Sequence, residues 1–218
     1  MASPTERVDF FFDPVCPWAW VTSRFTTEVA GLRGIDVEWR FISLRMVNEQ
    51  KDYGRDFPPG YVNSHEGGRA MLRVAAAARQ HGGNEAVARL YTQLGTRLHD
   101  HGRSQSELRE GDFSLIAESV VAAGLPAELE AAGKDEAHDA VIRAETDLAL
   151  SRTGSGVGTP ILTFDPGTAA EASFFGPVLG RIPRGDEALE IWDTVVTLAR
   201  TRDLYELKRT DRQRPDFS

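Results

Sequence analysis

From residue 61 to residue 153 the chain has almost no stretch with the apolar pattern of a β-strand. Five stretches, near 61–81, 84–100, 112–123, 126–132 and 135–152, carry apolar residues three or four positions apart, which predicts helices. Glycines separate them at positions 82–83, 102, 124 and 133. Any β-sheet must therefore be built from strands that lie before and after a helical block of about 90 residues.

The segment before this block predicts a βαβ unit. Residues 8–12 form an apolar run typical of a buried strand, and Asp13-Pro14 ends it. Pro17 suits the first turn of a helix, and apolar residues follow at helical spacing as far as Leu32. Residues 37–43 alternate between apolar and polar side chains, as a second strand does. The polar stretch 48–59 is expected to be a surface loop.

The segment after the block predicts a hairpin and a helix. Residues 161–164 and 172–175 are strand-like and flank a turn, and residues 184–199 have one apolar helical face. The glycines at 154–158 precede a proline and a strand, whereas a dinucleotide-binding loop follows a strand and opens a helix, so no nicotinamide or flavin site is predicted. The tail 208–218 is polar and is expected to be frayed. The order of elements favours an α/β domain interrupted by helices.

Charge and leader patterns limit the partners and the compartment. A net charge of -8 disfavours nucleic acid as a partner, because phosphate neutralisation needs an excess of cations. The first residues lack the pattern of a signal peptide, and no window has the apolar length of a membrane helix. We therefore expect a cytoplasmic protein with no membrane partner. Its only cysteine, Cys16, excludes an internal disulfide.

Cys16 lies just before the predicted helix that begins at Pro17. The unsatisfied N–H groups of a helix N-terminus favour an anion, which predicts a thiolate at neutral pH. The alternative is an inert sulfur, because free cysteine is among the most buried residue types.

The residues around Cys16 resemble those of the DsbA family of thioredoxin-fold proteins. The resemblance rests on Asp13-Pro-Val-Cys-Pro-Trp-Ala-Trp20 after a strand and on Val157-Gly-Thr-Pro160 before another. Further segments resemble the mycothiol-dependent nitroreductase branch of that family, from about Phe10 to Thr210: Ser43-Leu44 with Asn48-Glu49, Phe174-Phe-Gly-Pro-Val-Leu179 with Ile182-Pro-Arg-Gly185, and Glu206-Leu-Lys-Arg-Thr210.

The resemblance implies a fold and a domain division. It implies a thioredoxin-like fold, βαβ followed by ββα, formed by residues 1–55 and 154–218, with an all-helical lid subdomain at 56–153 inserted between the two parts. It also implies a cis peptide bond between Thr159 and Pro160, facing the active-site sulfur.

The resemblance further implies a site. Cys16 is the expected nucleophile in a turn with Pro17, Trp18 and Ala19, and Thr159 and Pro160 orient a small thiol. Relatives usually carry a second, resolving cysteine where this chain has Ala19, so the chain is either a natural one-thiol member or a variant from which that sulfur has been removed. Mycothiol is the implied reductant.

Three further groups of residues are candidates for a ligand. Trp18, Asn48 and Tyr61 match positions that resemble the thiol and substrate pocket, and an amide and two aromatic faces suit that role; the alternative is ordinary packing. His99 and His101 lack further metal ligands at suitable spacing, which favours surface or capping positions and predicts no metal site. Arg69 and Arg73 are one helical turn apart and are expected on a solvated face rather than at an anion.

Three functions remain open. The first is a thiol-dependent oxidoreductase, monomeric or homodimeric, that binds a small thiol and a small-molecule substrate such as a nitroaromatic compound or a disulfide. The second is a transferase or isomerase similar to the kappa-class glutathione transferases or the chromene-carboxylate isomerases. The third is a non-catalytic binding or chaperone module in which Cys16 is inert.

Overall fold

A computed structural model describes residues 6–101 and 105–217 of the 218-residue chain. Gly102, expected to separate two helices, lies outside the described residues, as do the first five residues on which the expectation about a signal peptide rests. No helix among the described residues is both long enough and apolar enough to span a membrane.

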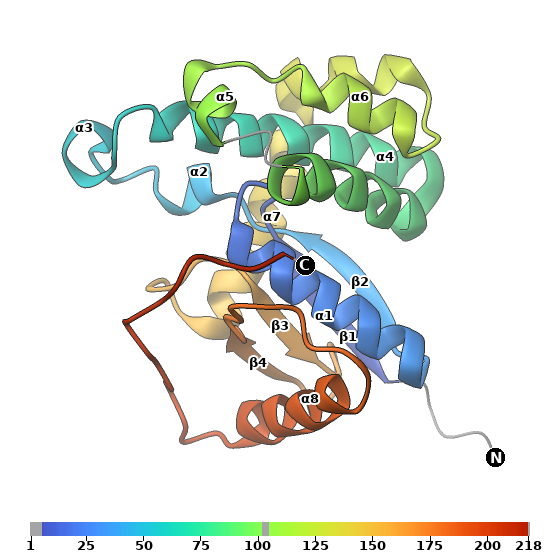
Figure 1. Cartoon of the computed structure of the whole chain (residues 1–218), viewed down its shortest axis with the longest axis vertical. Coiled ribbons are helices and arrows are strands. Elements are labelled where there is room, and N and C mark those ends of the chain that lie inside the picture. The colour runs from blue at the N-terminus through green and yellow to red at the C-terminus, as the bar shows by residue number, and fades with distance from the viewer. Residues whose placement is uncertain (1–5, 102–104, 218) are drawn as a thin grey trace.

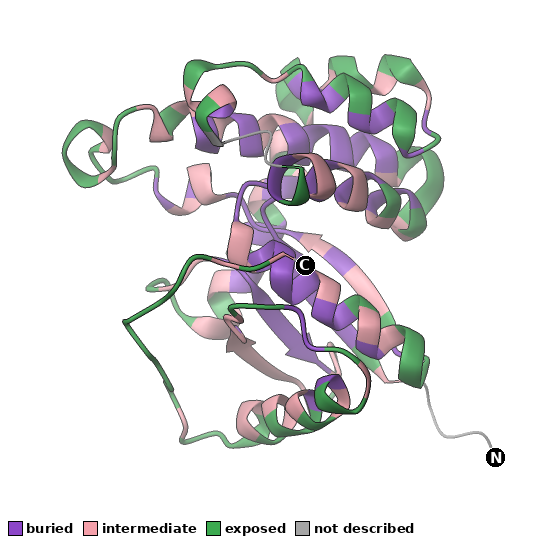
Figure 2. Cartoon of the chain, viewed as in Figure 1, coloured by how far each residue is buried: buried purple, intermediate pink, exposed green. Residues whose placement is uncertain are grey.

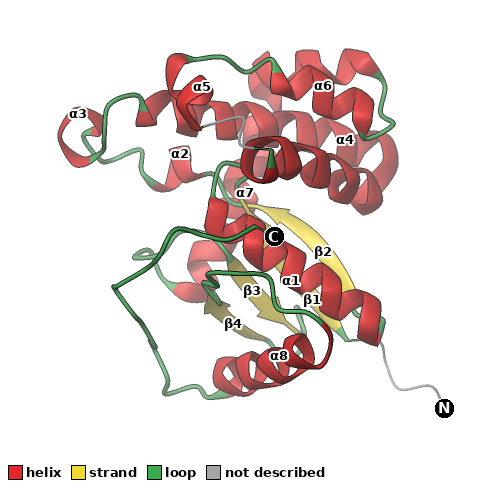
Figure 3. Ribbon diagram, viewed as in Figure 1, coloured by secondary structure: helices red, strands yellow, loops and turns green. Residues whose placement is uncertain are grey.

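Within the described residues, four strands form one mixed sheet in the order β2-β1-β3-β4 (Figures 1 and 3). The strands are β1 (Arg7–Phe12), β2 (Asp36–Phe41), β3 (Ile161–Phe164) and β4 (Ala172–Phe175). β2 runs parallel to β1, β3 antiparallel to β1, and β4 antiparallel to β3. The predicted βαβ unit and hairpin are thus confirmed.

The helices are α1 (Pro17–Arg33), α2 (Leu44–Val47), α3 (Tyr53–Asp56), α4 (Tyr61–Gly95), α5 (Gln105–Glu110), α6 (Leu115–Ala122), α7 (Asp139–Thr153) and α8 (Gly185–Arg200). As predicted, α4 is broken at Gly82 and Gly83, whose backbone angles are not helical. The stretch predicted to be helical at 126–132 is a helix, but it is the 3₁₀ helix Ala127–Lys134 and not an α-helix. The stretch predicted as a loop at 48–59 contains the single turn of α3.

Alternation along β1 gives the sheet two different faces. Phe10 and Phe12 belong to the cluster that includes Phe25 of α1 and Trp192 of α8, whereas Phe11 packs with Ala149 of α7. α1 and α8 therefore cover one face and α7 the other. α7 also binds the edge strand β2, because its Glu145 carboxylate accepts a hydrogen bond from the backbone N–H of Phe41 at 2.8 Å. The division into a sheet domain and a lid subdomain at residues 55 and 153 stays a prediction.

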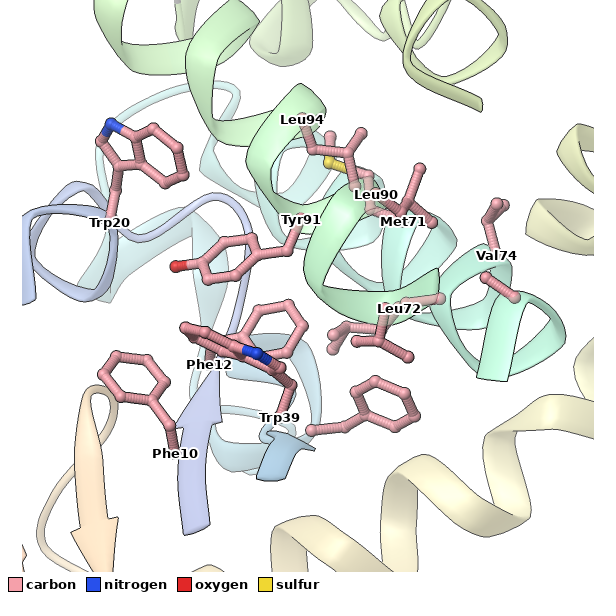
Figure 4. Packing of buried hydrophobic residues seen from close by; sticks show 14 of the residues in the cluster. Phe10, Phe12, Trp20, Trp39, Met71, Leu72, Val74, Leu90, Tyr91 and Leu94 are labelled. Atoms are coloured by element: carbon pink, nitrogen blue, oxygen red, sulfur yellow. The ribbon is translucent and has the colours of Figure 1, made fainter. Parts of the chain in front are cut away.

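An aromatic column joins the sheet to α4 (Figure 4). The Tyr91 ring of α4 stacks on Phe12 of β1, with ring centroids 3.9 Å apart, and meets Trp20 of α1 edge-on at 5.7 Å. Figure 2 shows buried residues running from the sheet through the start of α1 into the middle of α4. The helical block and the sheet therefore share one continuous core.

Candidate functional site

Cys16 is the residue at which the chain turns from β1 into α1. Its backbone N–H donates to the carbonyl oxygen of Asp13 at 3.0 Å, which closes the turn, and Pro17 occupies the first helical position. The sulfur caps the helix by accepting a hydrogen bond from the backbone N–H of Ala19 at 3.5 Å. The predicted position of the sulfur at a helix N-terminus is confirmed.

The Thr159-Pro160 peptide lies against this sulfur. The bond is cis, as expected. The Cys16 thiol lies 3.4 Å from the Thr159 carbonyl oxygen and donates to it, and the Thr159 hydroxyl donates to the carbonyl oxygen of Phe11 at 2.7 Å. Cys16 and the Thr159-Pro160 pair, candidates for one site, therefore meet at the end of β1, although they are far apart in sequence.

The expectation of a thiolate at neutral pH is wrong for this structure. Cys16 is only 7% exposed, and burial raises the pKa of its thiol from 9.0 to about 12. The hydrogen bond from Ala19 lowers this pKa, while the nearby Asp13 carboxyl raises it. The cost of burying a charge therefore outweighs the attraction of the helix N-terminus. A protonated thiol agrees with the hydrogen bond that the sulfur donates to Thr159.

Asp13 directly follows β1 and begins the motif that carries the family resemblance, but its contacts in the site were not predicted. Its buried carboxyl group accepts hydrogen bonds from the backbone N–H groups of Val15 at 3.1 Å and Leu44 at 2.8 Å, so it connects the turn at Cys16 to α2. Burial raises the pKa of Asp13 to about 7, against the opposing effect of these two hydrogen bonds. A Cβ atom at Gly68 of α4 would lie 2.5 Å from the Asp13 carboxylate, so the glycine permits the close approach of α4.

A π-helical turn, Thr96–Asp100, follows α4 and contacts the N-terminal end of α1. The His99 ring donates from Nε2 to the carbonyl oxygen of Pro14 at 2.9 Å, and Asp100 accepts from the Trp20 indole N–H at 2.7 Å. The prediction of a surface or capping position is therefore wrong for His99, which is buried, whereas His101 is exposed. Burial lowers the pKa of His99 to about 4.

The last described residues also reach this site. The Arg212 guanidinium lies 5.7 Å from the centroid of the Trp18 ring, and the Phe217 ring lies 5.6 Å from that of His99. Figure 1 shows the C-terminal segment returning to the start of α1. The backbone N–H of Asp216 donates to the carbonyl oxygen of Gly180 at 2.8 Å. The expectation of a frayed tail is therefore wrong for this segment, because its end packs against the core.

The remaining site candidates contact other groups. The Asn48 side-chain amide donates to the carbonyl oxygen of Leu44 at 2.8 Å. Tyr61, at the start of α4, stacks on Phe57 and lies under the guanidinium of Arg109, which is 4.7 Å from its ring centroid. Trp18 is half-buried, and Ala19 is fully buried. The binding roles of Asn48, Tyr61 and Trp18 stay predictions.

Arg69 and Arg73 of α4 differ in their burial and in their partners. Arg73 is buried and its Nε donates to Asp139 of α7 at 2.7 Å, so the expectation of a solvated face is wrong for this residue. The reason is that α4 is covered here by the following helices. Arg69 pairs with Glu66 one turn earlier at 2.7 Å. Among the described residues, no three His, Cys, Asp or Glu side chains gather as a metal site.

Comparison with known proteins gives a family match over most of the chain. The family model described as "Rv2466c-like: Mycothiol-dependent nitroreductase Rv2466c" matches residues 15–209. A relative from Mycobacterium tuberculosis, the uncharacterized protein Rv2286c, is 32% identical over 206 residues, which cover 93% of this chain and 81% of the relative.

Solved structures agree on the fold. A probable DsbA oxidoreductase, SCO1869, from Streptomyces coelicolor is similar with a TM-score of 0.57 and 20% identity, covering 94% of each chain. The cytosolic disulfide reductase DsbM from Pseudomonas aeruginosa has a TM-score of 0.56 and 18% identity, covering 88% of this chain and all of that one. The thioredoxin-like DsbA fold with an inserted helical region is thereby confirmed.

Proposed function

The chain belongs to the Rv2466c-like family of mycothiol-dependent nitroreductases, and from this premise we propose that it reduces small molecules with electrons from mycothiol, through Cys16 alone. The proposed substrates are nitroaromatic compounds or disulfides. The compartment proposed is the cytoplasm, and the similar fold of a reductase described as cytosolic supports it.

The observation that supports the proposal most is the contact between the Cys16 sulfur and the backbone just before Pro160. A sulfur at a helix N-terminus is placed to accept a thiol partner in a mixed disulfide, because the helix stabilises the thiolate whenever the sulfur is ionised or leaves. The adjoining Thr159 backbone is proposed to align the incoming thiol.

The proposed reaction on a disulfide substrate has three steps. The Cys16 thiolate attacks one sulfur of the substrate, which forms a mixed disulfide and releases the other sulfur as a thiol after protonation. In the second step, one mycothiol attacks the Cys16 sulfur of this mixed disulfide and displaces the substrate's remaining thiol. In the third step, a second mycothiol attacks the mycothiol sulfur now bound to Cys16, which forms mycothiol disulfide and releases the Cys16 thiolate. In sum, two mycothiols become one mycothiol disulfide, and one substrate disulfide becomes two thiols. Reduction of a nitro group to a nitroso group consumes the same two electrons and two protons and releases water.

The alanine at position 19 determines how the mixed disulfide can be released. Because no second sulfur follows Cys16, the enzyme cannot release its adduct by forming an internal disulfide, so each mixed disulfide must wait for an external thiol. The proposal also requires Cys16, which is only 7% exposed here, to become accessible to solvent. In that state the sulfur regains water, which removes the burial that raises its pKa.

The first test is intact-mass spectrometry after incubation with mycothiol disulfide. We expect a single mycothiol adduct on the native chain, no adduct on the Cys16→Ser variant, and loss of the adduct on addition of mycothiol. In the second test, mycothiol oxidation is followed with bis(2-hydroxyethyl) disulfide and with a nitroaromatic compound, and we expect turnover that requires Cys16.

Other outcomes identify the other functions. Conjugation or isomerisation of a substrate without net thiol oxidation would overturn the reductase proposal in favour of the transferase or isomerase. Absence of both the adduct and turnover would favour a binding module in which Cys16 is inert.

A further inference from the structure

A cavity of about 380 Å³ lies beside α1, on the side that faces β2 and the second half of α4. Its lining comes from α1, β2, α4 and the end of α6, and includes none of the residues of the Cys16 turn or of Thr159-Pro160. Arg24, its lining residue nearest to Cys16 in sequence, is eight positions further along α1, or about 12 Å at the rise of a helix. The cavity is therefore separate from the sulfur site.

The walls of this cavity are mostly apolar. Ile35, Val37 and Trp39 line it from the segment that leads into β2 and from β2 itself, and Ala88 lines it from α4. Its volume lies in the range of small-molecule sites, which are typically apolar with a few polar groups. Thr27 and Ala122 also line the cavity and are exposed, so the cavity is open to solvent.

Two arginines supply the charge of the cavity. Arg24 donates to the hydroxyls of Ser23 and Thr92 at 3.2 and 3.1 Å and lies 4.2 Å from the Trp20 ring centroid, and Arg89 donates from Nε to the carbonyl oxygen of Ala123 at 3.1 Å.

Neither arginine forms an ion pair with a carboxylate of the described residues, and the cavity lining contains no Asp or Glu. Burial lowers the pKa of Arg24, as expected for a guanidinium kept partly out of water. Each guanidinium therefore keeps N–H donors that an anion in the cavity can use.

The edge of β2 beside the cavity is closed to a further strand. The Asn84 side chain accepts from the backbone N–H of Trp39 at 2.9 Å and donates to the carbonyl oxygen of Val37 at 2.7 Å. These are the backbone groups that an added strand would need. A small molecule fits this surface better than an extended peptide does.

We propose that this cavity binds a small aromatic monocarboxylate, whose ring lies against Trp39 and Ala88 and whose carboxylate meets Arg24 and Arg89. A single negative charge on a flat apolar body suits two guanidinium groups that have no carboxylate partner in the described part of the chain, whereas a polyanion such as a nucleotide would lose more hydration than the apolar walls replace. The site does not use Cys16, so it stands or falls independently of the proposed reductase activity.

The test is isothermal titration calorimetry of the full chain with 1-naphthoate, and with 1-naphthamide as its uncharged analogue. We expect saturable binding of one naphthoate per chain and at least tenfold weaker binding of the amide. Arg89→Met, which alters an exposed side chain, should weaken naphthoate binding roughly tenfold, the value of one charge-assisted hydrogen bond. Arg24→Met should weaken it at least as much.

Two control variants complete the design. Arg33→Met removes an α1 arginine that pairs with Asp193 outside the cavity, and Cys16→Ser removes the sulfur; both should bind naphthoate as the native chain does. Circular dichroism establishes that each variant is folded. The proposal is overturned if the folded native chain shows no saturable binding, if the amide binds as tightly as the acid, or if Arg89→Met binds like Arg33→Met.

Discussion

The indole ring of Trp20 occupies the space that a side chain at position 95 would need. A Cβ atom built on Gly95 would lie 2.1 Å from Cε3 of that ring, and Trp20 is itself almost fully buried. The end of α4 therefore approaches α1 through a position where the chain has no side chain.

Gly95→Ala should consequently destabilise the protein. The added methyl group must displace Trp20 from its contacts with Tyr91 and Asp100, at a cost of about 2 kcal/mol or more. The measurement is the free energy of unfolding from urea titration. Gly31→Ala is the matched control, because it also lies in a helix but its Cβ meets nothing within 4 Å; it should be neutral or stabilising by up to about 1 kcal/mol. Equal effects of the two substitutions would contradict the close packing of Gly95.

The Cys16 thiol should react slowly in the folded protein. With its pKa raised to about 12, the thiolate fraction at pH 8 is very small, and the sulfur is also buried. We expect alkylation by iodoacetamide to be at least roughly 100-fold slower in the native chain than in urea, with a native rate that still rises above pH 9. Intact mass follows the reaction at this single cysteine. A native rate that levels off below pH 7 would mean that the folded protein holds a thiolate.

Restoring a second sulfur should change the fate of the adduct. In Ala19→Cys the new thiol lies one helical turn from Cys16, close enough to attack a mixed disulfide there. If the proposed chemistry holds, incubation with mycothiol disulfide should yield an internal disulfide, seen as a mass loss of about 2 Da, in place of the stable adduct of the native chain. Ala30→Cys, further along the same helix, is the control and should not remove the adduct from Cys16. A persistent adduct on Ala19→Cys would show that the new thiol cannot reach the mixed disulfide at Cys16.

His99 should make the stability depend on pH. Its pKa falls from 6.5 to about 4 on folding, so between these values the unfolded chain binds a proton that the folded chain does not. The resulting stability is complete above pH 6.5 and is lost as the pH falls to about 4, by up to about 3 kcal/mol. In His99→Gln, which can still donate to Pro14, the decline over this range should be smaller by that amount, as measured by urea titration from pH 4 to 7. Parallel curves for the two proteins would show that His99 titrates normally.

Phe217 should contribute to that burial. Phe217→Ala removes the ring that packs 5.6 Å from His99, so water gains access and the pKa of His99 should rise toward its ordinary value. The pKa can be followed by the NMR signals of the histidine ring protons. Tyr205→Ala changes an aromatic residue of the same tail that is 85% exposed, and it should leave the His99 signal unchanged. An unaltered pKa in Phe217→Ala would mean that the tail does not shield His99.

Periodicity predicted most of the elements, because strands and helices are encoded by neighbouring residues. The strand at 161–164 and the break at Gly82 and Gly83 are both present as predicted. The helix at Ala127–Lys134 was predicted, but its 3₁₀ type was not, because apolar residues three or four apart suit both kinds of helix.

The position of the site was predicted, but the pKa of its cysteine was not. The residues around Cys16 and Thr159 resemble a known family, and that resemblance placed the two together. The pKa of Cys16 depends on what covers the sulfur, which no local pattern specifies. His99 and Phe217 were missed for the same reason, since their contacts join segments far apart in the chain.

The aromatic column between the sheet and α4 provides an optical probe of their separation. Trp20 and Trp39 both meet the Tyr91 ring, from α1 and from β2, and both are almost entirely shielded from water. If α4 lifts away from the sheet, both indoles become hydrated and their fluorescence emission shifts to longer wavelength. Any separation of α4 from the sheet during a thiol reaction can thus be timed in a stopped-flow instrument without attaching a dye.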